Sequence, residues 1–181
     1  MKLVCGIGIN KKNRPSTTTK VYSTWRKLLD DCVNPKSKSK IGDFKDYTKF
    51  YDWYTTQIGY DLDYRISKDL LDKKNNKFSS DKCVLVPFDV SHFLRRTKSA
   101  RGDLPMGVDK QRSGDGFRYV ARASFGDKRE FLGMRSTIEE AFELYKVAKE
   151  SKARELAEKY RDQIDPRAYE ALLNYKVEIT D

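Results

Sequence analysis

The sequence predicts an α+β protein of two modules, one over residues 1–94 and one over residues 105–181, joined by a basic linker over residues 95–104. Two patterns carry this prediction. Residues 107–132 contain three short strand patterns separated by turns rich in Gly and Asp, and a long helical pattern follows them. Residues 64–94 contain a hairpin pattern followed by a short helix. We therefore expect two strands and a helix in the first module and a three-stranded antiparallel sheet plus helix in the second.

The charge of the chain favours a polyanionic partner. Lys and Arg number 37 against 27 Asp and Glu, which gives a net charge of +10. Hydrophobic residues make up 38% of the chain, which is enough for a packed core. A folded and strongly basic protein is most simply matched with nucleic acid.

The sequence offers neither a membrane span nor a signal peptide. No apolar run approaches the roughly 18 residues that a membrane span requires, and the first ten residues lack a signal peptide's apolar stretch and cleavage site. The three cysteines are widely spaced and odd in number, so they fit neither a disulfide framework nor a zinc clip. We expect a soluble, cytoplasmic protein with reduced core cysteines and no membrane partner.

The N-terminal module begins with an apolar run over residues 2–9, which predicts a strand that leads into a basic loop. Ser23 is expected to cap a helix that Asn34 and Pro35 end. Asp43 is expected to cap a second helix over residues 44–57, whose aromatic residues recur at helical spacing. A stripe of that period is more often core than a base-stacking surface, so we assign it to the core.

Residues 107–112, 117–125 and 128–132 are the three predicted strands of the C-terminal sheet. Side chains alternate along a strand, so the middle strand has an apolar face and a cationic face. The apolar face is expected to hold Phe117, Tyr119, Ala121, Ala123 and Phe125, and the cationic face Arg118, Val120, Arg122 and Ser124.

Ser136 or Thr137 is expected to cap the long helix, with Glu139 or Glu140 completing a capping box. Its apolar stripe can cover the apolar face of the sheet and leave the cationic face for a ligand. A twisted ribbon of strands fits the major groove of DNA, and the residues expected to contact DNA are Gln111, Arg112, Arg118, Arg122, Ser124, Arg129 and Phe131. The alternative is a sheet whose solvent face happens to be basic, and charge alone does not choose between the two.

Four short motifs in this region carry a resemblance. They are G-V at 107–108, V-A-R-A at 120–123, F-L-G at 131–133 and T-I-E-E-A-F-E-L-Y at 137–145. This order resembles the APETALA-type DNA-binding domain in its phage version, in which the three-stranded sheet enters the major groove. The resemblance places Arg122, Arg129 and Phe131 at contact positions, whereas Asp109 stands where a basic residue is expected.

A second resemblance covers nearly the whole chain. The segments that carry it include G-I-G-I-N at 6–10, T-W-R-K-L-L at 24–29, C-V-L-V-P at 83–87 and D-P-R-A-Y-E-A-L-L-N-Y at 165–175. Together they resemble free-standing HNH homing endonucleases of phages, whose ββα-metal unit would correspond to the N-terminal module. The resemblance implies DNA cleavage with a divalent cation, Mg²⁺ being the expected one, in an infected bacterial host.

An HNH site needs a carboxylate and an Asn or His to hold the cation, and a His to deprotonate water. Here Ser67 and Ser91 stand at two of the expected ligand positions, and Lys74 replaces a turn glycine. The remaining candidates for catalysis are Asp69, Asn75 and His92, of which Asp69 is the one candidate metal ligand. The alternative for His92, the single histidine of the chain, is a structural or exposed helical residue.

The linker carries four cations in seven residues, which would follow a DNA backbone; the alternative is a soluble hinge. These cations are Arg95, Arg96, Lys98 and Arg101. Beyond residue 150 the long helix is expected to continue to about residue 160, and a last helix begins near Pro166. We expect this last helix to pack on the long helix, or on a second copy of the chain in a homodimer.

The sequence thus favours a sequence-specific double-stranded DNA-binding protein that derives from an HNH homing endonuclease and needs no cofactor. Such a protein would act by occupying its site, for example as a transcriptional repressor. The alternative is an active, Mg²⁺-dependent HNH endonuclease that cuts or nicks its recognition site. A third option is a factor whose charge targets the surface of another protein.

Overall fold

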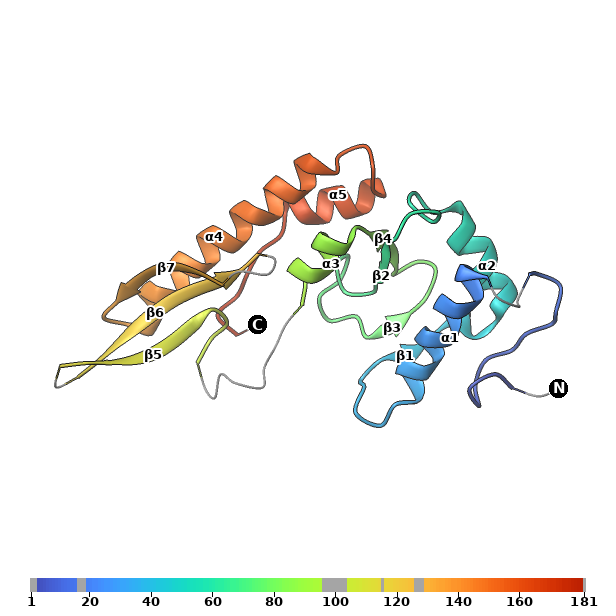
Figure 1. Ribbon diagram of the computed structural model, residues 1–181, viewed down its shortest axis with the longest axis horizontal. Helices are drawn as coiled ribbons and strands as arrows, with labels where there is room; N and C mark the ends of the chain where they lie inside the picture. Colours follow the sequence, from blue (N-terminus) through green and yellow to red (C-terminus); the bar gives the residue numbers. More distant parts are fainter. Residues whose placement is uncertain (1–2, 16–18, 96–103, 115, 126–128, 181) are drawn as a thin grey trace. The chain divides into compact units, whose positions relative to one another are not determined.

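The computed structural model describes residues 3–15, 19–95, 104–114, 116–125 and 129–180 (Figure 1). It is a mixed α+β structure with small sheets, which confirms the predicted class. The chain forms two compact units. The first unit comprises Met1–Pro87 and Asp162–Ala168, and the second comprises Phe88–Arg161 and Tyr169–Asp181.

The first unit contains two helices, a 3-10 turn and two small sheets. Strands β1 and β3 pair in parallel, whereas β2 and β4 pair antiparallel. The elements are α1 (Lys20–Val33), β1 (Lys40–Ile41), η1 (Asp43–Lys45), α2 (Tyr47–Thr56), β2 (Arg65–Ser67), β3 (Lys77–Phe78) and β4 (Val84–Val86).

An aromatic core holds the first unit together, as the helical spacing of the aromatic residues predicts. Trp25, Phe44, Tyr47 and Phe50 are fully buried. The indole of Trp25 donates a hydrogen bond to the carbonyl oxygen of Phe44 over 2.7 Å, so its polar atom is satisfied inside the core. Burying each of these rings stabilises the fold by about 2 kcal/mol. Most of the aromatic stripe is therefore packed in the core, and Tyr51 is the member that stays partly exposed.

The strand predicted for residues 2–9 is wrong. Val4 and Gly8 form a single antiparallel bridge around a tight turn, in which Cys5 and Gly6 have φ values of 50° and 76°. A Cβ atom on Gly8 would lie 2.3 Å from Leu29 Cδ1. The apolar run thus folds back against α1 because the absence of a side chain at Gly8 permits this close approach.

Two predicted helix starts are also wrong. Thr19 caps α1 by accepting a hydrogen bond from the Tyr22 amide over 3.2 Å, while Ser23 lies inside the helix. Asp43 begins the separate 3-10 turn η1, and Asp46 is the residue that caps α2. The carboxylate of Asp43 instead accepts hydrogen bonds from the hydroxyl and amide of Ser80, over 2.6 and 3.1 Å, and so ties this turn to a distant loop.

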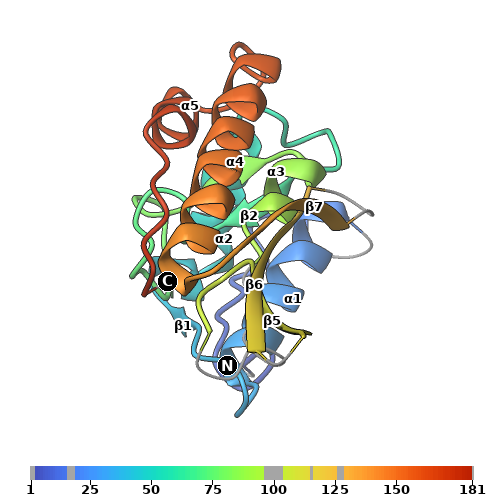
Figure 2. The ribbon, with the colours of Figure 1, turned by 90° about the vertical axis from the view of Figure 1, so that its left-hand side faces the viewer.

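The second unit is built on a three-stranded sheet and one long helix. The strands follow the order β5-β6-β7 and both pairings are antiparallel, which confirms the predicted meander. In both views α4 runs along this sheet (Figures 1 and 2). The elements are α3 (Phe88–Phe93), β5 (Val108–Ser113), β6 (Gly116–Ser124), β7 (Arg129–Arg135) and α4 (Ile138–Lys159), with α5 (Pro166–Leu173) shared between the units.

Helix α4 begins with the predicted capping box. The hydroxyl of Thr137 accepts a hydrogen bond from the Glu140 amide, and the Glu140 carboxylate accepts one from the Thr137 amide, both over 3.2 Å. The helix lies very close to the sheet at Gly107, where a Cβ atom would be 2.0 Å from the ring of Tyr145. The φ of Gly107 is +77°, so both space and backbone conformation favour glycine there.

Strand β7 is longer than predicted and contains an irregularity. Gly133 was expected to end the sheet, but β7 continues to Arg135. The register shifts between Ala121 and Arg122 of β6: Ala121 pairs with Gly133, Arg122 pairs with Phe131, and the intervening Leu132 is left over. Such a bulge lets the strand bend and continue beyond the glycine.

Two buried charged residues of α4 organise the rest of the second unit. The ammonium group of Lys149 donates a hydrogen bond to the backbone carbonyl oxygen of Phe93. It also lies 3.8 Å from the centre of the Phe93 ring. The carboxylate of Glu150 accepts hydrogen bonds from the Val177 amide over 3.1 Å and from Lys176 over 3.3 Å. One side of α4 thus holds α3, and the other holds the C-terminal segment.

The state of the cysteines and the hydropathy of the helices can be read from the structure. Cys5, Cys32 and Cys83 are free thiols. Burial raises the pKa of Cys83 to about 12, as expected for an inert core thiol. None of the helices in the described ranges is long and apolar enough to cross a membrane.

Candidate nucleic-acid interface

One face of the three-stranded sheet collects most of the predicted DNA contacts. The register pairs Gln111 with Arg118, Arg122 with Phe131, and Ser124 with Arg129. Paired residues point to the same side of a sheet. We call the resulting surface the arginine face; it includes Asp109, Gln111, Arg118, Val120, Arg122, Ser124, Arg129, Phe131 and Met134.

Helix α4 covers the opposite face. A Cβ atom on Gly133 would lie 2.9 Å from Leu144 of α4, and Gly133 pairs with Ala121, the neighbour of Arg122 in β6. Ala121 and Ala123 are buried beneath the helix side of the sheet. The arginine face therefore points away from α4, as alternation along the strands predicts.

Arg112 is the one described sheet residue of the predicted set that the structure separates from the others. It pairs with Phe117 and so lies on the helix side of the sheet. Phe117 was expected to be covered there, but it is 57% exposed, because the ends of β5 and β6 reach beyond α4 (Figure 1). The ammonium of Lys110 lies 4.0 Å from the centre of the Phe117 ring.

Asp109 joins the arginine face from the neighbouring strand. Its Oδ2 atom accepts hydrogen bonds from Arg122 Nη1 over 2.7 Å and from Arg129 Nη2 over 2.6 Å. Burial raises the pKa of the Asp109 carboxyl, but the two arginine hydrogen bonds outweigh it, and the pKa lies below its usual value. The Asp109 carboxyl is therefore ionised at neutral pH, so the face has one acidic side chain beside the three arginines Arg118, Arg122 and Arg129.

Several side chains of the arginine face are accessible to a ligand. The Arg129 side chain is 55% exposed and Phe131 is 64% exposed. Arg118 is exposed and donates one hydrogen bond to the Ser136 hydroxyl, which leaves further guanidinium donors available. A guanidinium can contact a phosphate or bind the O6 and N7 atoms of guanine.

Of the predicted linker contacts, only Arg95 belongs to the part of the chain that the structure describes, and it is exposed. The other three predicted cations, Arg96, Lys98 and Arg101, lie outside the described residues.

The candidate nuclease residues of the first unit are engaged in local turns. The hydroxyl of Ser67, which is buried, donates to Asp69 Oδ1 over 3.2 Å and accepts from the Leu70 amide over 3.3 Å. The amide group of Asn75 donates to the carbonyl oxygens of Lys68 and Lys77, and its Oδ1 atom accepts from the Lys77 amide over 3.1 Å. Asn75 thus closes the loop before β3 with both ends of its side chain.

His92 lies in the other unit. It is on α3, while Asp69 and Asn75 belong to the first unit. Its ring stacks on Phe88 with centroids 6.2 Å apart and an angle of 26° between the planes. In the described ranges, His, Cys, Asp and Glu side chains form no group of three or more that could hold a metal ion.

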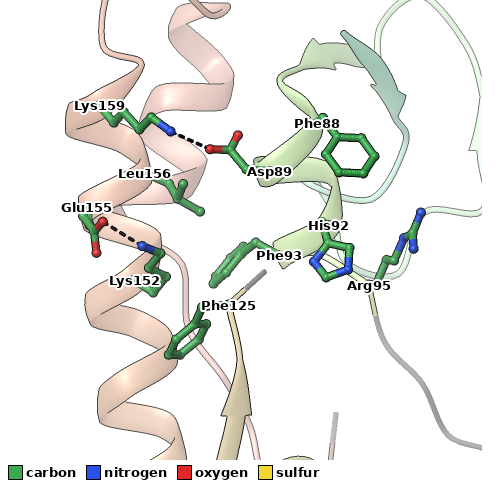
Figure 3. A pocket seen from close by; sticks show the side chains of 10 residues that line it. All are labelled: Phe88, Asp89, His92, Phe93, Arg95, Phe125, Lys152, Glu155, Leu156 and Lys159. Carbon is green, nitrogen blue, oxygen red and sulfur yellow. Dashed lines mark hydrogen bonds and ion pairs between the residues drawn. The ribbon is translucent and has the colours of Figure 1, made fainter. Parts of the chain in front are cut away.

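A pocket of about 460 Å³ lies within the second unit between α3, the end of β6 and α4 (Figure 3). Its apolar wall is formed by Phe93, Phe125 and Leu156. Two ion pairs, each 2.7 Å long, flank this wall and are drawn as dashed lines in Figure 3. The ion pairs join Asp89 to Lys159 and Lys152 to Glu155. The remaining residues that line the pocket are Phe88, His92 and Arg95.

Sequence reasoning missed the pairing of Asp89. Its carboxylate accepts hydrogen bonds from Lys159 and from the Tyr160 hydroxyl, both over 2.7 Å. Burial raises the pKa of Asp89, but these two donors lower it below its usual value. The partners lie 70 and 71 residues away in the sequence, so no local pattern could have indicated them.

Comparison of the chain with protein-family models, curated proteins and solved structures finds no match.

Proposed function

We propose that this protein binds double-stranded DNA sequence-specifically through the arginine face and acts by occupying its site, as a transcriptional repressor does. One observation carries the proposal: the sheet presents Arg118, Arg122 and Arg129 on the face that α4 leaves uncovered. A two- or three-stranded ribbon fits the major groove of B-DNA, which is about 12 Å wide. The resemblance to APETALA-type domains supports the same mode of binding.

The composition of the arginine face suits base recognition as well as charge attraction. Arginine side chains bind guanine, and glutamine binds adenine through two parallel hydrogen bonds. Gln111 lies opposite Arg118 in the register, so the two side chains can address neighbouring positions in the groove. Phe131 offers apolar surface for a thymine methyl group. These residue types support a sequence-specific interface.

The second candidate function is metal-dependent cleavage by the HNH-like module. It is favoured by the order of an antiparallel strand pair, β2 and β4, followed in the chain by α3. Mg²⁺ is usually bound through one or two carboxylates together with substrate phosphates. Asp69 supplies one carboxylate, whereas serine hydroxyls at 67 and 91 add no charge, and the Asn75 amide already binds backbone. We therefore favour occupancy over cleavage.

The deciding experiment selects bound duplexes from a random pool and incubates them with protein in EDTA, Mg²⁺ or Mn²⁺. Binding is read from gel shifts and strand breaks from a denaturing gel. We expect binding in all three conditions and intact DNA. Protein that binds no duplex in preference to others would refute the proposal.

Cleavage would replace the proposal with the nuclease function if it disappears in both Asp69→Ala and His92→Ala. Asp61→Ala is the matched control, because it removes an exposed carboxylate from a turn of the first unit outside the candidate site. Cleavage that survives all three substitutions would identify a contaminating nuclease. DNA binding would then be judged from the gel shifts alone.

A further inference from the structure

We propose that Asp109 is the residue that determines specificity on the arginine face, because it fixes Arg122 and Arg129 in orientations that read bases. This inference rests on the proposed DNA binding and assigns a role to a residue whose charge opposes DNA. An isolated carboxylate on such a surface would only repel phosphates. The geometry around Asp109 shows what it does instead.

The carboxylate gathers two guanidinium groups from two different strands. Arg122 comes from β6 and Arg129 from β7, and both donate to the same oxygen, Oδ2, over 2.7 and 2.6 Å. Asp109 itself lies on β5, so all three strands meet at this atom. The backbone amide of Arg122 also donates to the Gly107 carbonyl over 2.8 Å, which fixes the strand position beneath it.

An arginine side chain that is already fixed by an ion pair loses less conformational entropy on binding than an arginine side chain that moves freely. An arginine side chain has several rotatable bonds, and immobilising it at an interface costs entropy that reduces affinity. Each of these two arginines uses one guanidinium nitrogen for Asp109 and retains others for a ligand. Their remaining donors therefore approach DNA in a restricted geometry, which suits the bidentate contact with guanine.

The negative charge adds discrimination of its own. Attraction to phosphates is independent of sequence, and a carboxylate on the face weakens it for every duplex. Bonds to bases are formed only on the correct duplex. A group that lowers non-specific affinity while it orients base-reading side chains raises the ratio of specific to non-specific binding. Asp109 is one-third exposed, as is Arg122, so the cluster lies at the surface that DNA would meet.

The test replaces Asp109 with Asn, which keeps the shape and removes the charge. The matched control is Glu130→Gln, an identical charge change on an exposed residue of β7 that pairs with Ala123 on the opposite face. Dissociation constants are measured for the selected duplex and for a scrambled duplex over a range of salt concentrations. Melting curves confirm that the variants are folded. If Asp109→Asn does not fold, Asp109→Ser is measured in its place.

We expect Asp109→Asn to bind the scrambled duplex more tightly, with a salt slope steeper by about 0.9 for each arginine that gains a phosphate contact. The ratio of specific to scrambled affinity should fall by roughly tenfold, since base contacts are weakened. Renewed selection should give a less defined sequence. Glu130→Gln should keep the ratio of the wild-type protein.

Equal tightening on both duplexes, with the ratio unchanged, would overturn the inference and leave Asp109 as a simple charge. A fall of the same size in Glu130→Gln would overturn it too, because position on the sheet would then be irrelevant. A wild-type protein without preference for any duplex would instead refute the proposed function itself. The two failures are therefore distinguishable.

Discussion

Two arginines that the sequence assigns to the DNA contact lie on opposite faces of the sheet. Arg129 belongs to the arginine face, whereas Arg112 pairs with Phe117 on the side of α4. Both are exposed and carry the same charge. Replacing each with Ala therefore changes the net charge equally, so a difference between the two variants reflects the position on the sheet and the ion pair of Arg129 with Asp109.

We expect Arg129→Ala to weaken binding of the selected duplex by about 1–3 kcal/mol if the side chain contacts a base. That range corresponds to roughly a 5- to 150-fold increase in the dissociation constant. Removing Arg129 also leaves the Asp109 carboxylate with one cationic partner in place of two, which adds to the loss. For Arg112→Ala we expect less than about 0.5 kcal/mol, because the sheet separates it from the bound DNA and salt screens charges beyond about 10 Å.

Fluorescence anisotropy with a labelled selected duplex gives both constants, and titration at several salt concentrations gives the slopes. If Arg129 contacts only a phosphate, the slope should fall by about 0.9 without loss of sequence preference. Equal losses for Arg112→Ala and Arg129→Ala would refute the assignment of the arginine face as the binding surface. A larger loss for Arg112→Ala would place the DNA at the projecting ends of β5 and β6.

Three further predictions concern stability. Gly107→Ala should destabilise the second unit by about 2–4 kcal/mol in urea unfolding, because its φ is +77° and the new methyl group meets Tyr145; a loss below about 1 kcal/mol would contradict this packing. Thr137→Ala should cost about 1 kcal/mol by removing the cap of α4, and Thr137→Ser should restore most of it in the same assay. Burial raises the pKa of Glu150, but hydrogen bonds from a backbone amide and from Lys176 lower it below the usual value overall. Its stabilising contribution is therefore complete above the unfolded pKa of about 4.3 and is lost as the pH falls through the lower folded pKa. The acid limb of a stability–pH curve should become shallower in Glu150→Gln, and an unchanged limb would exclude this carboxylate.

The sheet and α4 could be predicted because their signals are local. Alternation, turn residues and a capping box each operate within a few positions, and the structure has the antiparallel pairings and the capping box that they predict. The same alternation already separates Gln111 from Arg112, so assigning both to one binding surface was inconsistent with the strand pattern. Phe117 required more, since its exposure depends on where α4 ends relative to the strands.

Other features were inaccessible because they depend on contacts between distant residues. Residues 2–9 have the composition of a strand, yet Val4–Gly8 form a turn in which Gly8 approaches Leu29 closely. Asp43 has the residue type of a helix cap, but its carboxylate instead accepts hydrogen bonds from Ser80, which lies 37 positions away in the sequence. Asp109 stood out only as an unexpected charge. Its partners lie 13 and 20 residues away on two other strands, and only the register brings them together.

The division of the chain between its units bears on how the protein is synthesised and how it can be dissected. The first unit includes residues 162–168, which follow the whole of α4 in the sequence. In this segment Ile164 is buried, and Arg167 donates a hydrogen bond to the carbonyl oxygen of Asp81 over 3.3 Å. The chain thus passes from one unit to the other three times, after residues 87, 161 and 168. On the ribosome the first unit therefore cannot be completed until residues 162–168, which follow α4, have been synthesised. A fragment that ends at residue 94 or 104 would lack part of its own core, and an exchange of modules by recombination at the linker would leave that part behind with the other half.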